Sequence, residues 1–345
     1  MEMNMIINLL EKGILPDKLI RWGIRKSRVQ RLKKFKSCDV EELQKLNMDF
    51  TSGLRFSPIA THTDDANKQH YEMPFEFFQK ILGKRMKYSE GYWSEESNTL
   101  DKADEKMLDL YCEMAELKDG MTILELGSGW GSLSLWLAEK YPKSKIITMS
   151  NSKVQGDFIR GICTERKIKN LTPKTADVNK FKPKNQFDRI LTIGMFEHLK
   201  NWDEIFARIS QWLKKDGKFF IDIFTHKDFP YHYETEGPAN WLGKHFFSGG
   251  MMPSDNLILY FQDNITLENH WKCSGIHYKK SADAWLKNLD MYSDELMPLL
   301  ENVYGKEDAM KWFHRWRMYF IALSEAFGSS NGQEWFSSQY RFRKK

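Results

Sequence analysis

The chain has 345 residues, of which 41% are hydrophobic and 29% charged, with a formal net charge of +5. This composition is ordinary for a soluble globular protein that buries a real core. The four cysteines, Cys38, Cys112, Cys163 and Cys273, lie far apart without a C-x-x-C pair, so neither a metal site nor a disulfide framework is expected. A reducing, cytoplasmic location fits this pattern.

The first 60 residues are expected to be helical, and residues 1–85 to form an N-terminal helical segment. Between Lys18 and Lys36 the sequence has nine Lys or Arg residues and no acid. The apolar residues of this stretch that could share one helix face are Leu19, Trp22, Val29 and Leu32. Residues 18–36 could therefore lie on an anionic membrane, or pack their apolar face on the rest of the protein.

Two further segments precede the core. The polar stretch 61–68 is expected to be a loop, and a helical segment is expected over 70–82. An aromatic, glycine-containing loop at 88–93 then leads into a long helix predicted from Leu100 to Leu117, because apolar residues recur there at helical spacing.

The stretch 122–131, T-I-L-E-L-G-S-G-W-G, is the strongest local signal. An apolar run ends in three glycines, which predicts a strand, a tight turn open to a ligand and the N-terminus of a helix. A dinucleotide fingerprint would need Gly or Ala where Ser132 stands, and a phosphate loop would need Gly-Lys-Ser/Thr. A dinucleotide site and a phosphate loop are therefore both disfavoured. A turn that merely joins a strand to a helix is the remaining structural alternative.

Strand and helix patterns alternate after this turn, which predicts an α/β fold with a Rossmann-like, doubly wound sheet over residues 86–345. The ligand of such a sheet lies at the carboxyl ends of the strands. The alternation lapses at about 226–275, and this aromatic insertion is expected to be a lid. The expected strands are 145–149, 171–176, 187–193, 218–224 and 335–342, and the expected helices are 152–167, 202–214, 282–300 and 306–327.

From about residue 88 to 343 the chain resembles the cyclopropane-fatty-acid-synthase and coclaurine-N-methyltransferase family of class I S-adenosylmethionine-dependent methyltransferases. The shared patterns include Y-S-x-G-Y-W at 88–93, L-E-L-G-S-G-W-G at 124–131, S-N-S at 150–152 and G-M-F-E-H at 194–198. Together they are more specific than the glycine turn alone. The resemblance implies S-adenosyl-L-methionine as the cofactor.

The resemblance also implies how the cofactor is held. Ser89 and Tyr92 would close over its methionine end, while Gly127 and Gly129 would pass beneath it. Asp177 would accept a hydrogen bond from the adenine amine, although an Asp at a strand end is often only a turn residue. The other residues assigned to this site are Asn151 and Gln155 at the ribose, and Val178 and Ile193.

Glu197 and His198 are the expected catalytic pair, because methyl transfer to an amine needs a carboxylate to hold the cation and a base to take its proton. The structural alternative is that they only orient one another. Glu90 is a third candidate: lipid-acting members carry a Cys there, which is associated with their bicarbonate site. A carboxylate would repel bicarbonate but attract a cationic acceptor. The residues expected in the acceptor pocket are His226, Tyr231, Trp241, Phe246 and Tyr278.

These observations predict a methyltransferase that N-methylates a small amine. The alternative is a lipid C-methyltransferase or cyclopropanase acting on unsaturated acyl chains, which Gly194 and Tyr278 favour, since amine members carry a Glu at the position of Gly194. A cofactor-binding protein without catalysis is the non-enzyme alternative. Nucleic acid is not an expected partner, because no basic stripe interleaved with aromatics is seen. A homodimer is possible.

Overall fold

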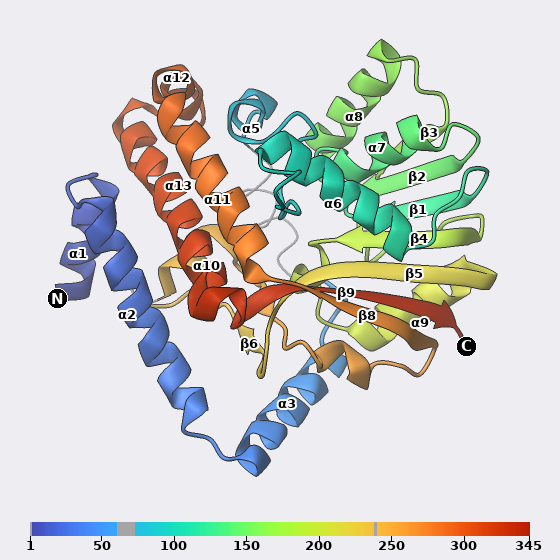
Figure 1. Cartoon of the computed structure of the whole chain (residues 1–345), viewed down its shortest axis with the longest axis horizontal. Helices are drawn as coiled ribbons and strands as arrows, with labels where there is room; N and C mark the ends of the chain where they lie inside the picture. Colours follow the sequence, from blue (N-terminus) through green and yellow to red (C-terminus); the bar gives the residue numbers. More distant parts are fainter. Residues whose placement is uncertain (1, 61–72, 238–239) are drawn as a thin grey trace.

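The computed structural model describes residues 2–60, 73–237 and 240–345, except for the side chains of 2–4, 31 and 34 (Figure 1). The predicted polar loop at 61–68 and the beginning of the helical segment expected from residue 70 lie outside the described residues. The remainder of that segment forms α5 (Phe75–Ile81).

A seven-stranded sheet with the order β3-β2-β1-β4-β5-β9-β8 forms the centre of the described structure. The first five strands in this order are parallel, and β9 pairs antiparallel with both β5 and β8. The doubly wound fold predicted from the sequence is therefore confirmed. The strands are β1 (Thr122–Leu126), β2 (Lys145–Ser150), β3 (Leu171–Thr175), β4 (Phe187–Ile193), β5 (Leu213–His226), β8 (Ile265–Cys273) and β9 (Trp335–Lys344).

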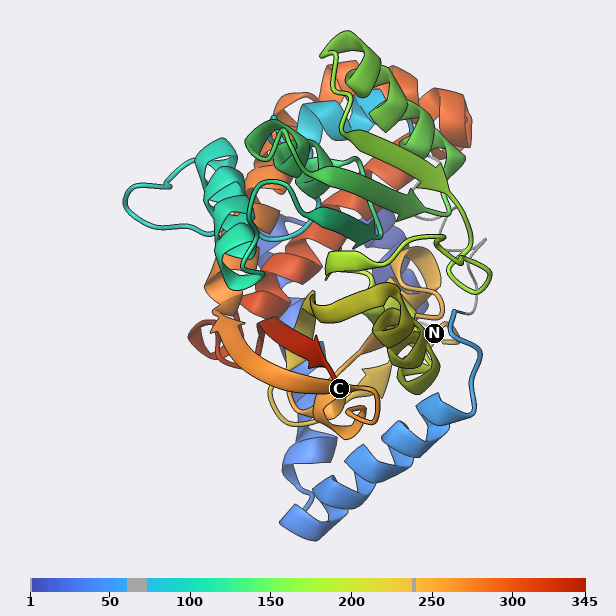
Figure 2. The ribbon, with the colours of Figure 1, turned by 90° about the vertical axis from the view of Figure 1, so that its right-hand side faces the viewer.

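Helices cover both faces of this sheet because its parallel strands are apolar on both sides (Figures 1 and 2). Ile123 of β1 packs in the cluster that includes α6 and α7, whereas its neighbour Leu124 packs in the cluster that includes α9. The helices are α6 (Leu100–Met114), α7 (Ser132–Lys140), α8 (Lys153–Glu165) and α9 (Trp202–Trp212). Helix α6 ends three residues before the predicted Leu117, near Glu116, whose φ is 53°.

Three C-terminal helices pack together beside the sheet (Figure 1): α11 (Gly275–Met291), α12 (Ser293–Tyr304) and α13 (Lys306–Phe327). The prediction of a single helix over 282–300 is therefore wrong, because α11 ends before Tyr292 and α12 begins after it. The insertion before them contains the short elements β6 (Tyr231–His232), α10 (Trp241–Phe246) and β7 (Met251–Met252). It also contains β8, which the sequence did not predict.

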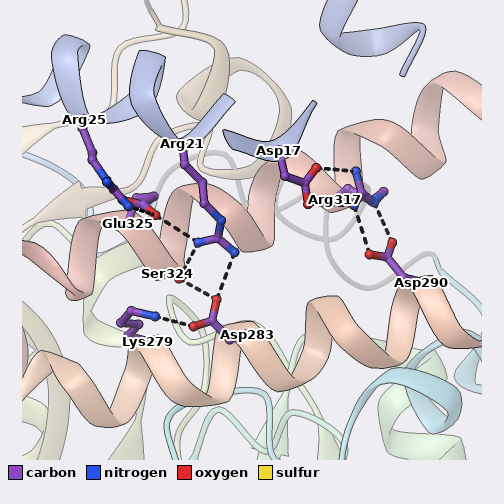
Figure 3. Close-up of polar contacts among 9 residues, drawn as sticks. All are labelled: Asp17, Arg21, Arg25, Lys279, Asp283, Asp290, Arg317, Ser324 and Glu325. Carbon is purple, nitrogen blue, oxygen red and sulfur yellow. Dashed lines mark hydrogen bonds and ion pairs between the residues drawn. The ribbon is translucent and has the colours of Figure 1, made fainter. Parts of the chain in front are cut away.

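The N-terminal segment forms α1 (Glu2–Glu11), α2 (Asp17–Lys36) and α3 (Val40–Arg55), and α2 packs along α13. Two arginines of α2 form ion pairs with α11 and α13 (Figure 3): Arg21 pairs with Asp283 at 3.2 Å and with Glu325 at 3.0 Å, and Arg25 also pairs with Glu325. At the start of α2, Asp17 pairs with Arg317. The division of the chain at residue 85 stays a prediction.

The apolar face expected on α2 is partly wrong. Leu32 is buried, and the inward face also carries the buried Ile20. Leu19, Trp22 and Val29 instead point outward and are 53%, 60% and 60% exposed, because the ion pairs with α11 and α13 turn the opposite side of the helix to the protein. In the described ranges, no helix is long and apolar enough to cross a bilayer.

Candidate active site

A cavity of about 210 Å³ lies at the carboxyl ends of the parallel strands. Its wall includes residues that follow four strands within two positions: Gly127 after β1, Asn151 after β2, Asp177 after β3 and Gly194 after β4. This is the edge at which an open α/β sheet binds its ligand. The position predicted for the site therefore coincides with a real cavity.

The glycine turn after β1 leaves room for a ligand against bare backbone. Gly127 and Gly129 have φ angles of 82° and 48°, a region that residues with a side chain rarely adopt. A Cβ added at Gly129 would meet no described atom within 4 Å, so the space in front of it is open. A Cβ at Gly127 would instead come within 3.0 Å of the Met195 side chain. Both glycines line the cavity.

Gln155 provides a hydrogen-bond donor on the same side of the cavity. Its Oε1 accepts a hydrogen bond from the Ser150 hydroxyl at 2.9 Å, and the residue is 1% exposed. Its Nε2 is buried and has no hydrogen-bond partner among the residues that the structure describes. A buried amide donor without a partner fits the oxygen of a polar ligand such as a ribose. Asn151, Val178 and Ile193 line the cavity as well.

Asp177 lines this end of the cavity but already has a structural partner. Its Oδ1 accepts hydrogen bonds from the backbone N–H and the side-chain amide of Asn179, at 2.9 and 3.0 Å. Asp177 therefore organises its own turn, and its contact with the adenine amine stays a prediction. The open glycine turn and the donor of Gln155 nevertheless fit S-adenosylmethionine, and Ser89 also lines the cavity.

Glu197 and His198 lie together in a short 3-10 helix, η2 (Phe196–His198), that follows β4. The Glu197 side chain is fully buried, and its Oε1 accepts a hydrogen bond from the Phe224 backbone N–H at 3.0 Å. Its Oε2 has no partner in the described part of the chain. Burial raises the pKa of Glu197 to about 8. The His198 ring lies parallel to the Phe247 ring. The residues of this group that line the cavity are Glu197, His198, Phe224 and Phe247.

Glu90 also lines the cavity, beside a polar network that the sequence did not predict. Burial and the nearby Asp222 raise the pKa of Glu90 to about 8. Asp222, on β5, accepts hydrogen bonds from the Tyr111 hydroxyl and from the Gln339 amide. Lys87 donates to the Glu90 carbonyl oxygen at 2.6 Å. Asp222 lies inside an otherwise apolar strand, which was the available sequence signal.

Aromatic residues from the C-terminal helices and from the insertion form another part of the cavity wall. Tyr278 of α11 and Tyr319 of α13 line the cavity together with Phe247. Tyr278 stacks on Phe327 with a centroid distance of 4.1 Å, which joins α11 to α13. Of the five residues expected in the acceptor pocket, Tyr278 is the one that lies there. Sequence analysis missed Phe247 and Tyr319, since nothing in their local pattern distinguishes them from core aromatics.

Five predicted site residues are absent from the described wall of the cavity: Tyr92, His226, Tyr231, Trp241 and Phe246. Tyr92 stacks on His277 with a centroid distance of 4.5 Å, facing α11 rather than the cavity. His226 is fully buried, and its Nε2 lies 3.3 Å from a carboxylate oxygen of Glu334. It therefore fixes the end of β5 to the start of β9.

The aromatic residues of the insertion serve mainly as packing. The Tyr231 hydroxyl accepts a hydrogen bond from an indole N–H of β9 at 3.2 Å. The Trp241 indole donates to Glu11 of α1 at 3.4 Å. Phe246 is fully buried and stacks on Tyr319 at 4.4 Å, so that it supports the cavity wall from behind.

Comparison with known proteins places the chain in a family. The mycolic acid cyclopropane synthetase family matches residues 60–335. The chain is 37% identical over 345 residues to (S)-coclaurine N-methyltransferase of Thalictrum flavum subsp. glaucum, covering 99% of this chain and 95% of that protein. It is 30% identical over 220 residues to cyclopropane-fatty-acyl-phospholipid synthase of Escherichia coli strain K12, covering 63% of this chain and 54% of that one.

A solved structure agrees over the whole length. The crystal structure of a coclaurine N-methyltransferase bound to N-methylheliamine and S-adenosylhomocysteine superposes with a TM-score of 0.96 at 36% identity, covering all of both chains. The open glycine turn and the donor of Gln155 fit the same cofactor here. The chain therefore belongs to the mycolic acid cyclopropane synthetase family and is an S-adenosylmethionine-dependent methyltransferase.

Proposed function

We propose that this enzyme N-methylates a small amine of the alkaloid kind for which its coclaurine and pavine relatives are named. The observation that carries the proposal is the pair Glu197 and His198. Glu197 has a buried carboxyl oxygen without a partner in the described structure, and His198, the next residue, lines the same cavity with its imidazole. An ammonium group supplies what that oxygen lacks, because it brings both a positive charge and N–H donors.

The chemistry assigned to these residues starts from a protonated amine, whose nitrogen has no lone pair. Glu197 keeps a proton in the free enzyme near neutral pH, since burial raises its pKa to about 8. When the cation arrives, Glu197 ionises and releases its proton to solvent, because an adjacent positive charge favours the carboxylate. His198 then takes the N–H proton of the acceptor as the general base and frees the nitrogen lone pair. When bound, S-adenosylmethionine supplies the methyl group as an electrophilic sulfonium.

The aromatic residues in the cavity wall also support the methylation of an amine. Tyr278, Tyr319 and Phe247 present rings to the cavity, and a ring face stabilises a cation by about 0.5–2 kcal/mol. These side chains also exclude water from the acceptor nitrogen, which strengthens its contact with Glu197. The role of the protein is then mainly to orient and desolvate the acceptor.

A labelled-methyl assay tests the proposal. Primary, secondary and tertiary amines, and vesicles of unsaturated phospholipid with added bicarbonate, are incubated with S-adenosylmethionine that carries a deuterated methyl group. Mass spectrometry should find the label on amines. His198→Ala should lower kcat, whereas the exposed Glu95→Gln should behave as wild type. Label transferred to phospholipid in a bicarbonate-dependent way, with none on any amine, would contradict the proposal and support the lipid alternative.

Peripheral membrane contact through residues 18–36 is a separate hypothesis, and the outward face of α2 is the observation that favours it. Trp22 and Val29 are exposed there, and the Lys26 ammonium lies 5.2 Å from the centre of the Trp22 ring. Basic residues and an exposed Trp suit an anionic lipid surface. Flotation with anionic and neutral vesicles tests this contact, and light scattering after gel filtration tests the homodimer.

A further inference from the structure

Three buried carboxyl groups gather at the acceptor end of the cavity: Glu90, Glu197 and Asp222 are each at most 2% exposed. They come from distant parts of the chain, namely the loop before α6, the 3-10 helix after β4, and β5. The negative charge of Asp222 acts on both glutamates. All three residues line the same cavity as Tyr278. The catalytic scheme uses Glu197 and leaves the other two without a role.

Asp222 is the member of this group that accepts hydrogen bonds from other side chains, although burial raises its pKa above the ordinary value. Its Oδ1 accepts a hydrogen bond from the Gln339 amide at 2.8 Å, and its Oδ2 accepts one from the Tyr111 hydroxyl. The Lys87 ammonium lies 3.3 Å from that same Tyr111 hydroxyl. Several donors directed at one carboxylate stabilise its ionised form.

Glu90 keeps a proton near neutral pH, because burial and the nearby Asp222 raise its pKa to about 8. The neighbouring Lys87 acts in the opposite direction but does not cancel this rise in the Glu90 pKa. Its ammonium donates to the Glu90 backbone carbonyl oxygen at 2.6 Å.

One carboxyl oxygen of Glu90 is available to a ligand in the cavity. Glu90 lines the cavity, and its Oε1 is buried without a hydrogen-bond partner in the residues that the structure describes. In an un-ionised carboxyl group that donates through one oxygen, the other is a carbonyl oxygen that can only accept. A buried acceptor without a donor costs stability, so a ligand that supplies the donor is favoured.

We propose that Glu90 is a specificity-determining residue whose Oε1 accepts a hydrogen bond from an O–H or N–H group of the acceptor other than the reacting nitrogen. The inference rests on the proposed amine methylation. It replaces the sequence-based expectation that Glu90 attracts the acceptor through a negative charge. The preferred substrates are then amines with a second donor group, either a hydroxyl or a second amine.

Glutamine at position 90 separates this role from a charge effect. The amide of Glu90→Gln carries no charge and keeps a carbonyl oxygen that can accept a hydrogen bond from the ligand, as the un-ionised acid does. Glu90→Leu has similar volume but cannot accept this hydrogen bond. A hydrogen-bonding role therefore predicts that Gln keeps the wild-type preference and Leu loses it. A role that depends on negative charge predicts that both substitutions lose it.

The test uses secondary arylalkylamines that the amine panel shows to be methylated, each compared as its ring-hydroxyl, ring-amino and ring-methoxy form. For wild type and Glu90→Gln, kcat/KM should favour at least one donor form over the methoxy form by about tenfold or more, and Glu90→Leu should reduce that ratio to about one. The hydroxyl and amino forms distinguish the two donor types. Glu95→Leu, on the exposed part of the same loop, is the matched control.

Calorimetric titration of the same amines into the enzyme complex with S-adenosylhomocysteine measures the preference without turnover. The proposal is overturned if Glu90→Leu keeps the preference, if Glu90→Gln loses it, or if both variants weaken S-adenosylmethionine binding while leaving the ratio unchanged. An enzyme that methylates amines but shows no donor preference refutes this inference alone. An enzyme that methylates no amine refutes the proposed function as well.

Discussion

Replacing Glu197 with Gln should make the protein more stable while it lowers activity. The structure places this carboxyl group in a fully buried position, where burial raises its pKa from the ordinary 4.5 to about 8. Between these two pH values the folded protein keeps a proton that the unfolded chain releases. Gln has the same shape, carries no charge and can still accept the hydrogen bond from Phe224.

The sign and size of this effect follow from proton linkage. Glu197 favours the folded state most strongly below its unfolded pKa of about 4.5, and this contribution is lost as pH rises towards about 8. Each unit of pKa difference corresponds to about 1.36 kcal/mol, so the loss reaches at most about 3 kcal/mol near pH 7. In a chain of this length, that amount raises Tm by roughly 2–4 °C.

Scanning calorimetry of wild type and Glu197→Gln, without ligands, measures this difference between about pH 5 and 9. The advantage of the variant should be small near pH 5, should grow with pH, and should level off above about 8. The exposed Glu95→Gln should show no such trend. An advantage that does not change with pH would show that Glu197 titrates normally, and would remove the electrostatic reason for treating it as a cation site.

Other parts of the structure give further expectations. Gly129→Val places a branched side chain in the open cradle at a positive φ, so calorimetry should find S-adenosylmethionine affinity reduced by more than about tenfold. Phe247→Ala, in the cavity wall, should raise the KM for the amine, whereas Trp241→Ala should leave it within about twofold because Trp241 contacts α1. Arg21→Ala removes ion pairs to two helices, so it should lower unfolding free energy by about 1–2 kcal/mol, less at high salt.

The sheet and the cofactor end of the site could be predicted because their determinants are local. A short apolar run followed by closely spaced glycines specifies a strand, a turn with positive φ and a helix without any distant contact. Gly127 and Gly129 are therefore where the sequence placed them. Strand β8 was missed because it lies at the edge of the sheet and its side chains are mostly half-buried, so its sequence lacks a continuous apolar run.

The acceptor end of the cavity could not be predicted from the sequence in the same way, because its geometry depends on tertiary packing. The aromatic insertion supplied a reasonable set of pocket candidates, yet Trp241 turns to α1 and Phe246 packs behind Tyr319. Aromatic side chains serve core and pocket equally well, so their enrichment shows that a wall exists without showing which rings form it. Tyr278 and Tyr319 reach the cavity because α11 and α13 pack side by side.

Acidic residues inside apolar strands could have indicated where buried polar groups gather in the fold. Asp222 stands in the run K-F-F-I-D-I-F of β5, and Glu125 stands in T-I-L-E-L of β1, where burial raises its pKa to about 7. A buried carboxyl group costs free energy unless partners compensate, so a sequence that keeps one in a central strand implies a second polar element nearby. For Asp222 those elements are Tyr111, more than a hundred residues earlier in the chain, and Gln339, more than a hundred residues later. The position of the acid could be noticed from the sequence, whereas its partners required the fold.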